Sequence, residues 1–218
     1  MSRQIIAEFD KDGIFVYQAY KASTADEALR KGTFGKGFNL DRMTWIKPSF
    51  GWMLYRSRYA TKHGNERILK IKLCHEGFQA ILGKGIPTSF DPHIFESSYE
   101  WRESLRRSEV RYQWDPDRDL RLHRLERRAL QLGIRGCVVR RYVDTWIISL
   151  EDVTGLAHAI KALVDRGSRQ LPSAPAERPY DVSAELRRRL GMRDQLTPTA
   201  LTDDSGDALR AEMEVRQH

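Results

Sequence analysis

RMTWIKPSFGWMLYRSR, residues 42–58, is the stretch that most strongly decides how the chain is interpreted. It interleaves large aromatic and sulfur-containing side chains with arginine and lysine. A buried helix does not need so many cations, and a surface helix does not need so many aromatic rings. The composition favours the wall of a pocket, in which aromatic faces hold a planar ring and cations hold an anion. The alternative is a buried amphipathic helix whose arginines extend to solvent.

A proline and a serine within this stretch predict where a helix begins. Pro48 disfavours helix at Lys47 and suits a first helical turn, and Ser49 is a typical capping residue. The spacing over 49–59 is helical. Because unpaired N–H groups and the helix dipole point outward at a helix start, we expect an anion site there, with Arg42 and Lys47 beside it.

The rest of the chain mixes short strands and helices, which predicts an α+β fold. We expect strands over 4–9, 14–20, 68–74 and 110–114, a strand pair at 138–142 and 145–150, and helices over 24–31, 76–82, 120–132 and 154–165. These elements predict a single compact domain over residues 1–166, with short mixed or antiparallel sheets flanked by helices. Residues 167–218 are rich in proline, serine and alanine at first, so we expect a linker, a short helix over 182–190 and a flexible tail.

Composition limits the function classes. The net charge of +7 and the pI of about 9.5 suit a partner that carries phosphate, such as nucleic acid or a nucleotide. Cys74 and Cys137 form no CxxC pair, and the histidines are scattered, so we expect no metal site. No apolar run has the length of a membrane span, and no secretory signal is evident at the N-terminus, so we expect a cytoplasmic protein without membrane contact.

A second rich region, VRYQWDPDRDL (residues 110–120), ends a predicted strand in a charged turn. Ligand contacts often gather at strand ends in α/β proteins, which makes Gln113, Trp114 and Arg118 candidate substrate-binding residues. Glu151 also ends a predicted strand and is the candidate catalytic acid, although any strand-to-helix turn can hold an acid. If one site exists, residues 42–56 must lie within contact range of residues 113–118.

Several blocks resemble a known family. IFVYQAY (14–20), RMTWIKPSFGWMLYRS (42–57), VRYQWDPDRDL (110–120) and YVDTWIISLEDVT (142–154) are similar to the bacterial and fungal family named domain of unknown function 4291. The similarity covers about residues 3–164. It implies one compact α+β domain and no established activity.

A remoter similarity is to the split-sheet fold of ADP-ribosyltransferases, which hold NAD with aromatic residues and a cation. That resemblance implies NAD as cofactor, ring stacking and pyrophosphate contacts by the set Tyr17, Tyr20, Arg42, Lys47, Ser49, Trp52, Tyr55 and Arg56, and a catalytic role for Glu151. The chain departs from the family pattern, because no His-Tyr-Glu or Arg-Ser-Glu series and no ExE or QxE pair is evident.

We therefore hold two hypotheses from the sequence. One is an NAD-dependent ADP-ribosyltransferase-like enzyme that acts on a nucleic-acid or nucleotide acceptor. The other is a non-enzymatic domain that binds RNA or DNA, since stacking aromatics flanked by cations suit single strands. An enzyme acting on another phosphorylated ligand also fits. The sequence contains no indication of the oligomeric state.

Overall fold

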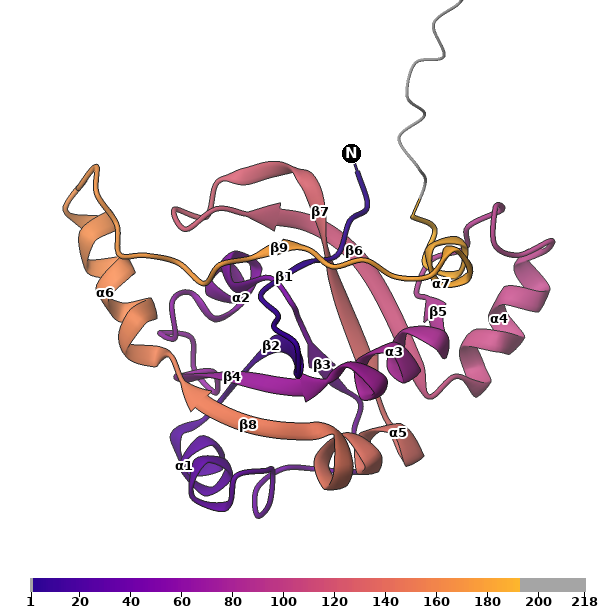
Figure 1. The fold of residues 1–218 in the computed structure, drawn as a ribbon, viewed down its shortest axis with the longest axis horizontal. Helices are drawn as coiled ribbons and strands as arrows, with labels where there is room; N and C mark the ends of the chain where they lie inside the picture. Colours follow the sequence, from indigo (N-terminus) through magenta and orange to yellow (C-terminus); the bar gives the residue numbers. More distant parts are fainter. Residues whose placement is uncertain (1, 193–218) are drawn as a thin grey trace, which may run out of the picture.

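The computed structural model describes residues 2–192 and has the expected α+β architecture (Figure 1). Its strands are β1 (Ile6–Ala7), β2 (Gly13–Tyr20), β3 (Thr44–Ile46), β4 (Arg67–Cys74), β5 (Gly85–Pro87), β6 (Val110–Arg118), β7 (Arg124–Ile134), β8 (Ile147–Asp152) and β9 (Arg178–Pro179). Its helices are α1 (Ala22–Lys31), α2 (Phe50–Ser57), α3 (His75–Gly83), α4 (Ser98–Arg107), α5 (Gly136–Arg141), the π-helix η1 (Tyr142–Trp146), α6 (Thr154–Asp165) and α7 (Ala184–Arg189).

Two main sheets build the domain. The smaller has the order β2-β4-β8 and is antiparallel throughout. The larger has the order β3-β7-β6-β5, with β5 parallel to β6 and the other pairs antiparallel. The two sheets meet at one bridge, where Tyr17 N–H donates to Lys47 O at 2.7 Å and Lys47 N–H donates to Tyr17 O at 3.2 Å. This bridge places β2 and β3 side by side at the sheet junction.

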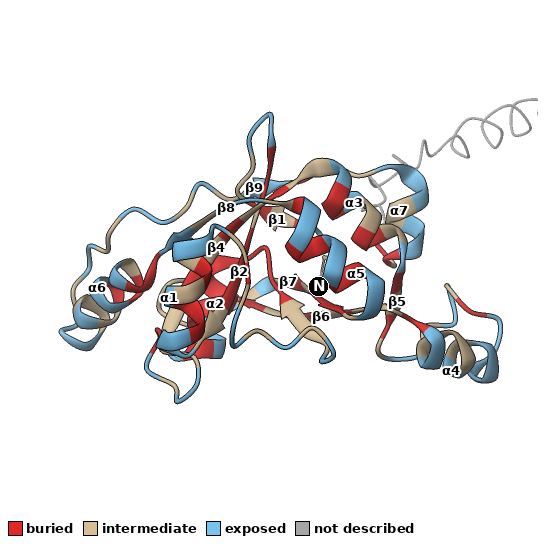
Figure 2. Ribbon diagram, turned by 90° about the horizontal axis from the view of Figure 1, so that it is seen from below, coloured by how far each residue is buried: buried red, intermediate tan, exposed pale blue. Residues whose placement is uncertain are grey.

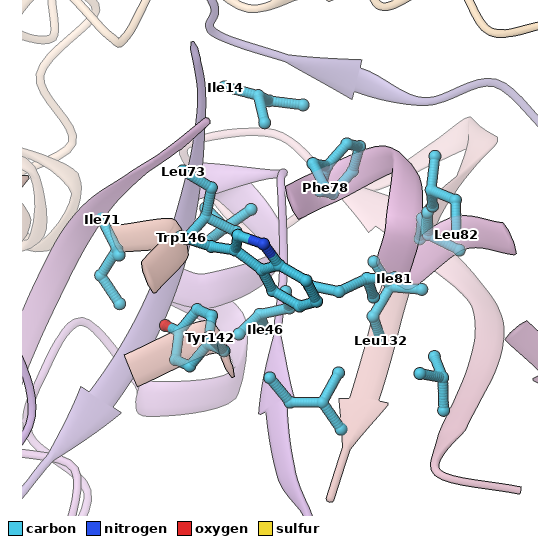
Figure 3. Packing of buried hydrophobic residues seen from close by; sticks show 14 of the residues in the cluster. Ile14, Ile46, Ile71, Leu73, Phe78, Ile81, Leu82, Leu132, Tyr142 and Trp146 are labelled. Atoms are coloured by element: carbon cyan, nitrogen blue, oxygen red, sulfur yellow. The ribbon is translucent and has the colours of Figure 1, made fainter. Parts of the chain in front are cut away.

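The main core lies between the two sheets and under α3 (Figure 3). There the ring of Trp146 lies among Ile71 and Leu73 of β4 and the apolar face of α3. Gly77 allows this approach, because a Cβ at that position would overlap the Trp146 ring. Trp146 is 2% exposed, so a side chain from η1 ties α3 to β4.

The opposite face of the small sheet packs against a second, smaller core cluster. Phe50, Met53 and Leu54 of α2 meet Tyr17 of β2 there, together with Ala157 and other residues of α6. Figure 2 shows the buried residues concentrated around the strands, whereas α4 at one end has half-buried and exposed residues and no buried ones. Within residues 2–192, no helix combines the length and the apolar character that crossing a membrane requires.

The segment expected to be a linker packs against the domain. After α6 it crosses the molecule through β9 to α7 (Figure 1), and β9 pairs antiparallel with β1. Tyr180, Leu190 and Met192 are buried in the main core, and α7 lies where the short helix was expected. These apolar side chains explain why the segment differs from a free linker. The expected flexible tail lies beyond Met192, outside the described residues.

Two expected elements are wrong. The predicted helix over 120–132 is the strand β7, because Leu130, Leu132 and Ile134 pair with β6 and face the core, and this pairing overrides the helix propensity of Arg, Leu and Glu. The predicted strand over 138–142 is α5 and the start of η1, where Val138 and Val139 are buried. In both segments tertiary burial decides the local structure.

Candidate functional site

A cleft of about 890 Å³ opens between α2 and the outward face of the large sheet. Its walls also include the end of β2 and the loop before β3. The lining that bears on chemistry comprises Gln18, Tyr20, Lys21, Phe38, Arg42, Trp45, Lys47, Trp52, Tyr55, Arg56, Gln113, Asp115, Arg118 and Gln131. Residues 42–56 and 113–118 therefore share one cleft, as the single-site interpretation of the sequence required.

Helix α2 is fixed against β6 by a buried carboxylate and a glycine. Ser49 Oγ accepts from Trp52 N–H at 3.1 Å, which is the predicted helix cap, and donates to Asp117 Oδ1 at 2.6 Å. Asp117 is 1% exposed and also accepts from Arg127 Nε at 2.8 Å. A Cβ on Gly51 would overlap the carbonyl oxygen of Arg118, so only glycine allows the helix to approach the strand this closely.

At the start of α2, where the sequence predicted an anion site, side chains of the protein take two of the backbone N–H groups. Phe50 N–H donates to Glu177 Oε1, which comes from the segment leading to β9, and Trp52 N–H is taken by Ser49. Burial raises the pKa of Glu177 to about 8. The Glu177 carboxyl thus occupies one of the N–H groups that the predicted anion site would use.

Cations without salt bridges dominate the cleft. Its lining contains five cationic side chains and one carboxylate, that of Asp115. The five are Lys21, Arg42, Lys47, Arg56 and Arg118, and in the described part of the chain none of them forms a salt bridge. Many cations elsewhere are paired, for example Arg67 with Asp152. An excess of unpaired positive charge in one concave site favours an anionic ligand.

Lys47 is the most deeply placed of these cations. It is 5% exposed, its Nζ donates to Trp45 O at 3.3 Å, and it lies 5.0 Å from the centre of the Trp52 ring. Burial, with the neighbouring charge of Arg56, lowers the pKa of Lys47 to about 7, whereas Asp115 opposes the shift. The amine is therefore poised between its charged and neutral forms near neutral pH, and a bound anion would favour the charged form.

Arg118 and Tyr55 form a stacked pair at the mouth of the cleft. The Arg118 guanidinium carbon lies 4.2 Å from the centre of the Tyr55 ring, and its NH1 donates to Leu122 O at 3.2 Å. Arg118 Nε is buried and has no hydrogen-bond partner among residues 2–192, which is costly unless a ligand supplies an acceptor. Tyr55 is 46% exposed, whereas the other aromatic residues of the described lining are buried or half-buried.

A polar group on the sheet forms the floor. Gln113 and Gln131 lie opposite each other on β6 and β7, and Gln131 Nε2 donates to Gln113 Oε1 and, at 2.7 Å, to Asp115 Oδ2. Among the described residues, Gln113 Nε2 and Gln131 Oε1 have no further partner, so one donor and one acceptor remain free. Burial raises the pKa of Asp115, and the charges of Lys47 and Arg128 oppose this shift.

Four of the candidate residues from the sequence do not line this cleft: Ser49, which packs behind it, and Tyr17, Glu151 and Trp114. Tyr17 is fully buried against Phe50, with ring centres 5.2 Å apart. Glu151 pairs across the small sheet with Lys70, which pairs with Tyr17, so all three side chains lie on the sheet face opposite to that of Gln18. Trp114 points into the core, where its Nε1 donates to Leu190 O at 2.9 Å.

The remaining candidates, Tyr20, Arg42, Lys47, Trp52, Tyr55, Arg56, Gln113 and Arg118, do line the cleft, and Ser49 supports it from behind. Sequence reasoning missed Asp115 and Gln131. Asp115 was assigned to a turn, although β6 continues to Arg118 and places it on the same face as Gln113. Gln131 was assigned to a helix. The available signal was the spacing of Gln113 and Asp115, because residues two apart on a strand lie on the same face.

The comparison with protein families agrees with the first of the two resemblances noted in the sequence, and none of the comparisons bears on the second. A search of curated proteins finds no match to the chain. A scan against protein families matches residues 4–180 to one family, and this range includes both sheets and every candidate residue. The chain therefore belongs to the family described as "Domain of unknown function (DUF4291)".

Proposed function

We propose that the protein is an NAD-dependent transferase of the ADP-ribosyltransferase type and that the cleft beside α2 binds NAD. The observation that supports this most directly is the set of five cations without salt bridges in residues 2–192, gathered around a single carboxylate. A pyrophosphate needs several such donors, because charge-assisted hydrogen bonds are stronger than neutral ones. Arg56 and Arg42 are exposed and can reach a ligand at the mouth, and Lys47 meets it from the floor.

The uncharged parts of NAD also find partners. Tyr55 offers an exposed ring face for adenine or nicotinamide. The free donor on Gln113 and the free acceptor on Gln131 match a primary carboxamide, which offers one acceptor and two donors. Arg118 Nε, which is buried and unpartnered within the described part of the chain, would gain an acceptor from a phosphate oxygen. The meeting of a three-stranded and a four-stranded sheet at the cleft is compatible with the split-sheet fold that the resemblance implied.

The catalytic carboxylate in this proposal, acting as a general base, is that of Asp115 in place of Glu151. Asp115 is the only carboxylate among the described residues that line the cleft, and Gln131 orients it. Its raised pKa suits a group that accepts a proton during the reaction. Glu151 lies on the other face of the small sheet, as described above.

Calorimetric titration with NAD tests the proposal. Wild type should bind NAD, and Arg42→Ala and Arg56→Ala should each weaken binding by roughly tenfold or more, which is the effect of losing one charge-assisted contact. Arg166→Ala is the matched control, because Arg166 is exposed and lies outside both α2 and the lining of the cleft. If wild type shows no heat of binding and no rise in melting temperature with NAD, the proposal is wrong.

The second candidate function is a non-enzymatic single-strand binder. The observation that favours it is the exposed Tyr55 ring beside Arg118, since bases stack on such rings without sequence preference. That function predicts an affinity for RNA or DNA that falls steeply with added salt and does not change when Asp115 becomes asparagine. Turnover of NAD that is lost in Asp115→Asn would exclude it.

A further inference from the structure

Lys47 lies on the face of the large sheet that forms the floor of the cleft. Ile46, the last residue of β3, is buried in the main core. Because side chains alternate along an extended chain, Lys47 points the other way, to the face that carries Gln131 and Asp115. All three of these residues line the cleft. A group bound on the floor can therefore meet the amine of Lys47 and the carboxyl of Asp115 together.

The Lys47 amine has no carboxylate close enough to hold its proton. Nζ donates to Trp45 O and lies over the Trp52 ring, and among residues 2–192 it forms no salt bridge. Burial and the charge of Arg56 on α2 lower the pKa of this amine, and the charge of Asp115 on β6 opposes them. A desolvated amine beside another cation is the environment in which lysine acts as a nucleophile near neutral pH.

The same cleft offers an anion site and a proton donor beside this amine. Arg42, Arg56 and Arg118 line it and, in the described part of the chain, form no salt bridge, so they can hold a phosphate group. Asp115 is half-buried, and burial raises its pKa, which keeps more of the carboxyl protonated than in water. The lining therefore combines a nucleophile, an acid and a phosphate site.

We propose that Lys47 forms an imine with a phosphorylated aldehyde, a compound that carries a free aldehyde and a phosphate or pyrophosphate group. The Nζ lone pair bonds to the aldehyde carbon as the carbonyl π bond breaks, and an amine proton moves to the oxygen, which gives a carbinolamine. The protonated Asp115 carboxyl gives its proton to that hydroxyl group, which leaves as water while the nitrogen lone pair forms the C=N bond. The Asp115 carboxylate and the bound phosphate stabilise the positive charge of the protonated imine.

Two sources could supply such an aldehyde. ADP-ribose, the product of NAD hydrolysis, opens to an aldehyde at the carbon that nicotinamide has left. A free aldehyde phosphate, for which pyridoxal 5′-phosphate is a probe, needs no NAD. NAD itself cannot form an imine, because its ribose C1′ is bonded to the nicotinamide nitrogen, so NAD can only compete for the cleft. The imine therefore goes beyond the proposed function and does not require it.

Reductive trapping on the full chain tests this proposal. Wild type is incubated at pH 7 with pyridoxal 5′-phosphate, pyridoxal or ADP-ribose, and sodium cyanoborohydride reduces any imine to a stable amine that peptide mass spectrometry assigns to one lysine. Lys47 should react at least about tenfold faster than two exposed lysines, Lys21 at the rim of the cleft and Lys36 outside it. Pyridoxal, which lacks the phosphate, should modify Lys47 at least about tenfold more slowly. The phosphorylated aldehyde that reacts at the lower concentration identifies the source.

Two variants connect the adduct to the chemistry. Lys47→Met should abolish it, and Lys36→Met is the matched control that should retain it. Asp115→Asn should slow its formation about 100-fold, because the acid that expels water is lost. Removing the carboxylate also leaves more of the amine neutral, which alone would speed the reaction, so a slower rate identifies the proton transfer. The assignment of the adduct in wild type needs no variant and decides the proposal even if Lys47→Met does not fold.

Addition of saturating NAD separates the imine from the proposed function. An adduct on Lys47 that NAD suppresses supports both. An adduct on Lys47 that NAD leaves unchanged supports the imine and refutes NAD as a ligand of this cleft. Equal modification of Lys21, Lys36 and Lys47, or no adduct on Lys47, overturns the imine. In that case a heat of NAD binding in the same protein leaves the proposed function standing.

Discussion

Replacing Lys47 with methionine should change how the stability of the protein depends on pH. The lysine is 5% exposed, and its pKa in the folded protein is about 7, against an ordinary value of 10.5. Because the fold disfavours the charged amine, Lys47 destabilises the folded state at low pH. The difference in pKa corresponds to roughly 5 kcal/mol, at about 1.4 kcal/mol per pH unit.

The sign follows from proton binding. Between pH 7 and pH 9 the unfolded chain keeps the Lys47 proton while the folded protein loses it, so the free energy of unfolding should rise with pH. The gain from this one group is about 2 kcal/mol over that interval. Lys47→Met keeps a long apolar side chain but has no proton to lose, so its stability should not show this gain.

Urea unfolding of the two proteins at pH 7, 8 and 9 gives the comparison. Titrating groups that do not act on Lys47, Glu177 among them, contribute equally to both proteins, so the difference between the curves reports Lys47 together with its coupling to Asp115. Lys36→Met is the control, because Lys36 is exposed, and its curve should run parallel to that of wild type. If the curve of Lys47→Met is also parallel to that of wild type, Lys47 is not buried as a neutral amine and this reasoning is wrong.

Three further predictions follow from the same contacts. Gly51→Ala should lower the free energy of unfolding by about 1–3 kcal/mol, because the added Cβ overlaps Arg118 O. Gly155→Ala is the control and should cost nothing, because its Cβ meets nothing within 4 Å; equal free energies from denaturant titration of the two variants would refute the close approach of α2. Wild type should lose stability as the pH rises from about 4.5 to about 8, because the folded protein holds the Glu177 proton over that range while the unfolded chain has lost it. Glu177→Gln should not show this loss. Melting temperatures of both proteins across the range test this, and identical profiles would contradict it. Asp115→Asn should slow the release of nicotinamide from NAD at least about 100-fold, whereas Glu151→Gln should leave the rate unchanged. If a chromatographic assay of nicotinamide finds Glu151→Gln slow and Asp115→Asn normal, the catalytic role belongs to Glu151.

Much of the fold could be predicted from local sequence. Ser49 caps α2 as expected, and β4 (Arg67–Cys74) covers the strand that was expected over 68–74. β7 could not be predicted, because its Arg, Leu and Glu residues favour helix and only the pairing with β6 makes it a strand. The packing of Tyr180 and Leu190 on the core was equally hidden, since a segment rich in proline and serine resembles a linker.

The candidate site was predictable where charge and aromatic residues cluster in sequence. Arg42, Tyr55 and Arg56 stand close together and do share the cleft. The acid was not predictable, because Asp115 and Glu151 both follow strand patterns and only the register places one on the cleft wall and the other on the far face of the small sheet. A shift of one residue along a strand changes the face on which a side chain lies.

Transfer of label from NAD tests the central claim most directly. NAD labelled in its adenylate phosphate is incubated with wild type or with Arg42→Ala, in the presence of single-stranded RNA, single-stranded DNA and protein acceptors. The account predicts label on a polynucleotide, nicotinamide released in equal amount, and loss of both with Arg42→Ala. Wild type that transfers no label, releases no nicotinamide and is not stabilised by NAD would contradict it.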